Sequence, residues 1–180
     1  MGLAEMQRLL AQVATDPQVE EQLVAELSLS AEQVRFFAVG LRRKRLGIAR
    51  KHLPLTSRAL GPEFERLFAQ YARTAPLRGT RCYRDDAIGF CQFLQRTVAE
   101  ASVRECARYE AAWLETDAPG RRLSVRAFWR GGGALAGPYI ALWLRLSPDG
   151  PLRHTSVPLW PTDAPRRLFN HNRLRPRVHS

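Results

Sequence analysis

The sequence predicts an α+β protein, with an N-terminal helical bundle followed by a small antiparallel β-sheet. Up to about residue 116, apolar residues recur three and four positions apart, the spacing of one face of an amphipathic helix. After the proline and glycine of segment 117–120, apolar and polar residues alternate, as in strands with one buried face. We therefore predict a helical domain over residues 1–116, a small antiparallel β domain over 117–161 and a basic tail over 162–180.

Capping signals and prolines set the expected helix limits. Two short helices are expected at 3–13 and 17–28, and Ser30 with Gln33 forms a capping box that opens a long helix to about residue 52. Pro54 is expected to end that helix. The later helices are expected to begin at Gly61-Pro62, at Ala87 behind the dipole-compensating pair Asp85-Asp86, and at a second capping box of Ser102 with Glu105.

Glu110 falls on the inward face of the last predicted helix, which is expected to end near Thr116. An ionised carboxylate is costly to bury without a partner. We therefore expect Glu110 to be a structural buried charge that pairs with an arginine from a neighbouring helix.

Three alternating runs, at 123–130, 139–146 and 152–159, predict the strands. The expected buried face includes Leu123, Val125, Ala127, Ile140, Leu142 and Leu144. The opposite face is expected to be exposed and to bind a peptide, since arginines beside aromatics suit acidic and apolar residues and an extended peptide can add to a sheet edge. The candidate peptide-binding residues are Arg126, Phe128, Arg130, Tyr139, Trp143 and Arg145. The alternative is that the three aromatic side chains among them pack against the helical domain.

A net charge of +11 favours anionic partners, such as nucleic acid, acidic peptides or acidic proteins. Much of the charge lies between Glu32 and Glu63, where no acidic residue occurs. A partner-binding surface and a solvated helix face both explain this run, and a DNA-reading helix is a third possibility. The run consists of Arg35, Arg42, Arg43, Lys44, Arg45, Arg50, Lys51 and Arg58.

No pattern of catalytic, metal-binding or cofactor-binding residues emerges from the sequence. The four histidines are dispersed, and the three cysteines lack the CxxC spacing of a metal or redox site. We therefore expect a protein that is not an enzyme and holds no metal or cofactor. The sequence also shows neither the apolar run of a signal peptide nor a membrane-spanning run, so we expect a cytoplasmic protein.

From the long helix onward, the order and spacing of several short motifs resemble one bacterial family. It is the helical domain, once labelled DNA-binding, of the partner subunits of multinuclear non-heme iron oxidases, which modify ribosomally made peptides in methanobactin and thiaglutamate pathways. The matching motifs are Arg50-Lys51-His52-Leu53-Pro54-Leu55-Thr56, Ala59-Leu60-Gly61-Pro62-Glu63-Phe64, Phe68-Ala69-Gln70-Tyr71, Pro76, Phe90, Phe93-Leu94 and Ala107-Arg108-Tyr109-Glu110. They span about residues 35 to 115.

The resemblance implies a non-catalytic accessory subunit of ribosomal peptide natural-product biosynthesis. Such a subunit forms a heterodimer with a TIM-barrel multinuclear iron oxidase, which holds the iron, and binds the precursor peptide that the oxidase modifies, with cysteine as the expected residue. Family members commonly have Phe-Pro where this chain has Leu53-Pro54, and many have a longer C-terminal part. The alternative function is a DNA-binding transcriptional regulator that uses the Arg42 to Lys51 stretch and the arginine-rich tail.

Overall fold

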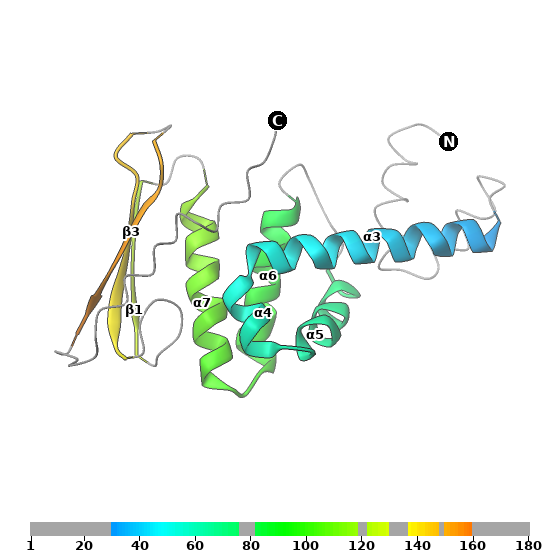
Figure 1. Ribbon diagram of the computed structural model, residues 1–180, viewed down its shortest axis with the longest axis horizontal. Coiled ribbons are helices and arrows are strands. Elements are labelled where there is room, and N and C mark those ends of the chain that lie inside the picture. Colours follow the sequence, from blue (N-terminus) through cyan, green and yellow to red (C-terminus); the bar gives the residue numbers. More distant parts are fainter. Residues whose placement is uncertain (1–29, 76–81, 119–121, 130–136, 148–149, 160–180) are drawn as a thin grey trace.

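The computed structural model describes residues 30–75, 82–118, 122–129, 137–147 and 150–159. Within these ranges the chain forms five helices followed by a three-stranded antiparallel sheet (Figure 1), which confirms the α+β class. None of the described helices has the length and apolar character needed to cross a membrane. The predicted helices at 3–13 and 17–28 and the basic tail lie outside the described residues. The elements are α3 (Ala31–His52), α4 (Pro54–Leu60), α5 (Glu63–Ala72), α6 (Cys82–Thr97), α7 (Ala101–Thr116), β1 (Leu123–Phe128), β2 (Tyr139–Leu144) and β3 (Arg153–Pro158).

Of the two predicted capping boxes, only the first forms. At the start of α3, the Gln33 N–H donates to Ser30 Oγ at 3.2 Å and the Ser30 N–H donates to Gln33 Oε1 at 2.9 Å. The box predicted at Ser102 is wrong, because the N-cap of α7 is Glu100, two residues earlier, and Ser102 lies inside the helix. Ser102 instead donates its hydroxyl to the Glu100 carboxylate at 2.5 Å.

Pro54 does not only end the long helix, as predicted, but also begins the seven-residue helix α4. Proline suits this first position because its missing N–H would have no partner there. Gly61 ends α4 with φ 54°, a left-handed conformation that glycine adopts without strain, and α5 follows at Glu63.

The helical core lies between α3, α5, α6 and α7 and is built around aromatic rings. Phe64 and Phe68 of α5 both meet Phe90 of α6 edge to face, with centroids 5.3 Å and 5.1 Å apart. Such edge-to-face pairs stabilise a core beyond the area they bury. Gly89 lets α6 approach α5, because a Cβ at this position would lie 2.4 Å from the Tyr71 hydroxyl.

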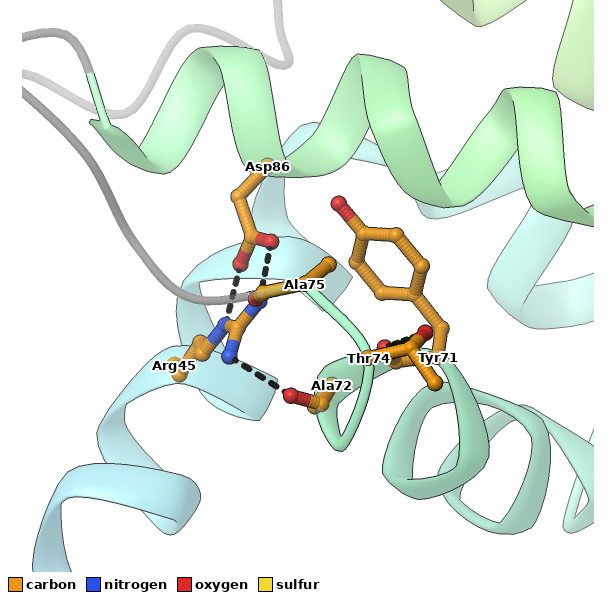
Figure 2. A network of polar contacts seen from close by, with 6 residues as sticks. All are labelled: Arg45, Tyr71, Ala72, Thr74, Ala75 and Asp86. Atoms are coloured by element: carbon orange, nitrogen blue, oxygen red, sulfur yellow. Dashed lines mark hydrogen bonds and ion pairs between the residues drawn. The ribbon is translucent and has the colours of Figure 1, made fainter. Parts of the chain in front are cut away.

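A buried ion pair joins α3 to α6 (Figure 2). Arg45 donates through Nε to Asp86 Oδ2 at 2.7 Å and through Nη2 to Asp86 Oδ1 at 2.6 Å, and its other hydrogen bonds reach the carbonyl oxygens of Ala72 and Ala75. Both side chains are at most 4% exposed. Two predictions are therefore wrong: Arg45 is not part of a basic surface, and Asp86 pairs with an arginine in place of compensating a helix dipole.

Helix α7 separates two apolar clusters. Ala107 and Leu114 belong to the helical core, whereas Tyr109 and Ala112 pack into a second cluster against the sheet. Figure 1 shows α7 covering one face of the sheet, with the other described helices on the far side of α7. The domain boundary at residue 117 stays a prediction, and the sheet shares α7 with the helical bundle.

Candidate protein-binding surface

The face of the sheet that packs on α7 is lined with aromatic side chains. Phe128, Tyr139 and Trp143 are 0% exposed. Phe128 stacks on Tyr139 with centroids 4.9 Å apart, and Trp143 lies 5.4 Å from the ring of Tyr109 on α7. His154 of β3 closes this cluster through a 3.1 Å contact between its Nε2 and the Tyr109 hydroxyl.

The prediction that Phe128, Tyr139 and Trp143 form an exposed peptide-binding face is therefore wrong, and the alternative packing against the helices is found. The physical reason is the size of the aromatic rings. Packing them against α7 buries more apolar area than packing the smaller side chains of the opposite face there would.

The three candidate arginines lie in different surroundings. Arg126 on β1 is exposed, and its guanidinium lies 3.8 Å from Glu115. Arg145 follows β2 and pairs with Asp117 at 2.9 Å, with only 12% of its side chain exposed. Arg130 lies outside the described residues. The five candidates that the structure describes therefore lie on one sheet or directly after one of its strands, but they do not form one continuous exposed face.

The opposite face of the sheet, which we call the outer face, is apolar and exposed. Leu123, Val125 and Val157 are 58%, 49% and 57% exposed, and the β2 side chains between them are half-buried. The register places these side chains in three rows across the strands. The rows are Leu123, Leu144 and Arg153; Val125, Leu142 and Thr155; and Ala127, Ile140 and Val157.

The sequence had identified the apolar rows of β1 and β2 but assigned them to the buried face. No described helix covers the outer face in Figure 1. Contiguous exposed apolar patches often mark interaction sites, whereas single exposed apolar residues are common on any protein surface.

The two edge strands differ in how their outward backbone groups are used. The Arg145 N–H donates to the Arg122 carbonyl at 2.8 Å, next to the pairing of β2 with β1. Because backbone groups alternate in direction along a strand, the carbonyls of Val125 and Ala127 point away from β2. Side-chain guanidiniums already donate to both, from Arg126 at 3.1 Å and from Arg108 of α7 at 2.5 Å. The β1 edge is therefore partly occupied by arginines.

The β3 edge has a different set of outward groups. The Leu159 N–H donates to the Pro138 carbonyl at 2.9 Å. Because backbone groups alternate in direction along a strand, those of Thr155 and Val157 point toward β2, and the N–H and carbonyl of Ser156 point outward. Among the described strands, β3 pairs only with β2. An extended peptide that adds to this sheet meets fewer competing side chains at β3 than at β1.

Glu110 is buried, as predicted, but its partner is not an arginine. Its carboxylate accepts hydrogen bonds from the backbone N–H groups of Leu55 at 2.6 Å and Thr56 at 2.9 Å, in the first turn of α4. Burial raises the pKa of Glu110 to about 7, and these hydrogen bonds oppose the shift. The arrangement fixes α4 to α7, which is a structural role.

The exposed side of α3 carries most of the predicted basic run. Arg43, Lys44 and Lys51 are exposed, and Arg50 lies 3.4 Å from Glu65 of α5. No acidic residue follows Glu32 on α3, so this side of the helix is uniformly positive. The described residues contain no cluster of three or more histidine, cysteine, aspartate or glutamate side chains able to hold a metal ion.

Comparison with known proteins gives one family match. A model of the family described as SCO6045-like, C-terminal domain, matches residues 20–96. The match ends within α6, so α7 and the sheet lie beyond it. No curated protein and no solved structure matched the chain. The chain is thus similar to this family over its helical part, and its relation to oxidase partner subunits stays a proposal.

Proposed function

We propose that this chain is a non-catalytic accessory subunit of ribosomal peptide natural-product biosynthesis. In this proposal it binds a precursor peptide and forms a cytoplasmic heterodimer with a TIM-barrel multinuclear iron oxidase, which modifies the peptide at cysteine. The oxidase supplies the iron. The observation that supports the binding role is the edge strand β3, which among the described strands pairs only with β2, beside a face of the sheet that no described helix covers. The link to an oxidase comes from the motif resemblance over residues 35 to 115.

Peptide binding is assigned to the edge of β3. A precursor segment that adds there gains main-chain hydrogen bonds to the outward groups of Ser156, in the manner of an added strand. An arginine can bind an acidic residue of the peptide only if its side chain is accessible. Arg126 is the better candidate, because its side chain is 46% exposed and that of Arg145 is 12% exposed. Reversing the charge of Arg145 would also break its pair with Asp117 and would confuse binding with folding.

A proline scan of the two edges tests this assignment, using synthetic copies of the short peptides encoded by the reading frames next to the gene as candidate precursors. Ser156→Pro removes one outward N–H of β3, and proline is tolerated at such edge positions. We expect its affinity for the peptide to fall about tenfold, the loss of about one hydrogen bond. Val125→Pro makes the same change at the β1 edge and is expected to leave the affinity unchanged. Ser156→Ala, which keeps the N–H, should bind like the wild type.

Coexpression tests the function as a whole. The chain is coexpressed with the neighbouring reading frames, including any iron oxidase and short peptide among them, and the mass of the peptide is measured by mass spectrometry. We expect a mass shift only when all three are present, and a 1:1 complex of the chain with the oxidase on size-exclusion chromatography. A fully modified peptide in cells that lack this chain would contradict the proposal.

A DNA-binding regulator is the second candidate, and the positive side of α3 favours it. Salt titration of binding to random duplex DNA separates the two functions. A regulator that uses Arg43, Lys44 and Lys51 would show a slope of log K against log salt of about −2 to −3 from these contacts alone. The charge-reversed variant Lys44→Glu/Lys51→Glu would then lose most of that slope. An oxidase partner is expected to bind DNA weakly and to keep its oxidase affinity in this variant.

A further inference from the structure

We infer that the acidic segment 17–28 packs antiparallel along the first half of α3, where it covers an apolar stripe and offsets part of the basic charge. The stripe consists of Val34, Phe37, Ala38 and Leu41. Segment 17–28 lies outside the described residues, and its sequence predicts a helix. The inference does not rest on the proposed function, because it concerns which part of this chain occupies one side of α3.

The stripe is an apolar helix face that the described core does not include. Its four members are three and four residues apart, the spacing of one side of a helix. Val34 and Ala38 are 2% and 1% exposed, and Phe37 is 42% exposed. All four lie outside the two apolar clusters that the described residues form. Figure 1 shows the first half of α3 extending beyond the other described helices, so the stripe needs a different partner.

The connection to α3 brings segment 17–28 to this stripe. Only residues 29 and 30 separate the segment from Ala31, where α3 begins. Ser30 has an extended backbone, with φ −70° and ψ 147°, so the segment cannot continue α3 as one helix. Helices joined by so short a connection pack side by side in antiparallel directions. A helix over 17–28 is about 18 Å long, enough to pass the whole stripe.

The apolar side of the segment matches the stripe. Val19, Leu23 and Leu27 are spaced four residues apart, which puts them on one side of a helix. Antiparallel packing places Leu27 near the start of the stripe, Leu23 near its middle and Val19 near its end. The family match begins at residue 20, so the unit that this family shares includes most of the segment as well as α3.

The charges of the two elements are complementary. Residues 1–29 contain five acidic residues and one basic residue, whereas α3 contains one acidic residue and seven arginines and lysines. Glu20 and Glu26 lie three positions before and after Leu23, so they flank the apolar side of the predicted helix. Opposite charges along two packed helices favour this pairing over other arrangements.

This packing limits which part of α3 is open to an anionic partner. In the antiparallel arrangement Glu26 comes level with Arg35, and Glu20 comes near Arg43. The acidic side chains then lower the positive potential over the first half of the helix. Arg50 and Lys51 lie beyond the reach of the segment, so the last turns of α3 keep their full positive charge.

Disulfide trapping in the full-length chain tests the inference. Leu23→Cys/Phe37→Cys places one cysteine on the segment and one on the stripe. The matched control is Leu23→Cys/Phe36→Cys, because Phe36 is 83% exposed and lies on the opposite side of α3 from the stripe. We expect the first pair to form its disulfide about tenfold faster under mild oxidation, since only cysteines with Cα atoms within about 7 Å can be joined.

Peptide mapping identifies the disulfide. Trypsin cleaves after Arg8, Arg35 and Arg42, so the two introduced cysteines fall in different peptides, 9–35 and 36–42, and mass spectrometry distinguishes their disulfide from any that involves a native cysteine. Adding Glu20→Lys/Glu26→Lys to the first pair should slow its disulfide about threefold at low salt. Adding Glu21→Lys, on the far side of the predicted helix, should leave the rate unchanged.

Four results would overturn the inference or its electrostatic part. Equal rates for the two cysteine pairs would show that the segment is not held on the stripe. A faster disulfide with Phe36→Cys would place the segment on the outward side of α3. A disulfide that joins two chains, seen as a dimer on non-reducing electrophoresis, would make a second copy the occupant. An unchanged rate in Glu20→Lys/Glu26→Lys would refute the charge pairing.

Discussion

The helical bundle and the sheet place their costly side chains in opposite ways. The bundle buries an arginine and an aspartate and gives both hydrogen-bond partners, so its charged groups are satisfied inside the fold. The sheet has a tightly packed aromatic side against α7 but exposes large apolar residues on its outer face. The difference lies in the buried charges, which the bundle supplies with partners; exposed apolar residues occur in both regions, with Phe36 on α3 83% exposed and Leu123 on β1 58% exposed.

The strongest test of the bundle removes one member of the buried ion pair. Asp86→Ala leaves the Arg45 guanidinium buried without its counter-charge, and we expect a loss of about 3–5 kcal/mol in the free energy of unfolding. Urea denaturation measures the loss. The double variant Arg45→Met/Asp86→Leu should recover most of it, because neither charge is then buried. A loss below about 1 kcal/mol in Asp86→Ala would show that Arg45 reaches water.

The second prediction concerns Glu110, the buried carboxylate between the two regions. Its folded pKa of about 7 lies above its ordinary value of 4.5, so the folded state holds the proton more tightly. Its contribution to stability is therefore complete below about pH 4.5 and is lost as the pH rises through about 7, by about 3 kcal/mol.

The measurement is urea denaturation from pH 4.5 to 8 for the wild type and Glu110→Gln, which does not titrate. Subtracting the two curves isolates Glu110 from other groups. One such group is His52, whose pKa is lowered by burial and by the charge of Arg84 and which acts in the opposite direction. A difference curve that is flat across this range would contradict the raised pKa.

A pair of glycine substitutions tests packing within the bundle at a smaller scale. Gly89→Ala adds a Cβ that meets the Tyr71 hydroxyl, so we expect a loss of about 1–3 kcal/mol. Gly47 on α3 has no atom within 4 Å of an added Cβ, so Gly47→Ala should stabilise the protein by about 0.5–1 kcal/mol through helix propensity alone. Thermal denaturation compares the two, and an equal sign would refute the packing argument.

The smallest expected effect is on the outer face. Val125→Thr keeps the β-branched shape and removes apolar character at a position that is half exposed, so we expect a change within about 0.5 kcal/mol in the isolated chain. Phe128→Ala, on the buried side of the same strand, should cost about 3–5 kcal/mol. If Val125→Thr were as harmful as Phe128→Ala, the outer face would be covered in the free protein.

Local signals in the sequence predicted much of the fold. The Ser30 capping box and the three strands could be predicted because each depends on residues a few positions apart, although the equally local box at Ser102 was wrong. The buried side of the sheet could not, since both alternating rows contain apolar residues and only the presence of α7 decides between Val125 and Phe128. Backbone amides as the partners of Glu110 leave no trace in the sequence either.

Helix α7 has one further consequence for how the molecule responds to a ligand. Because Leu114 and Tyr109 lie in different clusters on one helix, separation of the sheet would expose one side of a helix that also forms a wall of the helical bundle. We therefore expect the opening fluctuations of the two regions to be linked, and a partner bound to the sheet to slow both. Amide hydrogen exchange at α4, which Glu110 ties to α7, would register a partner bound on the far side of that helix.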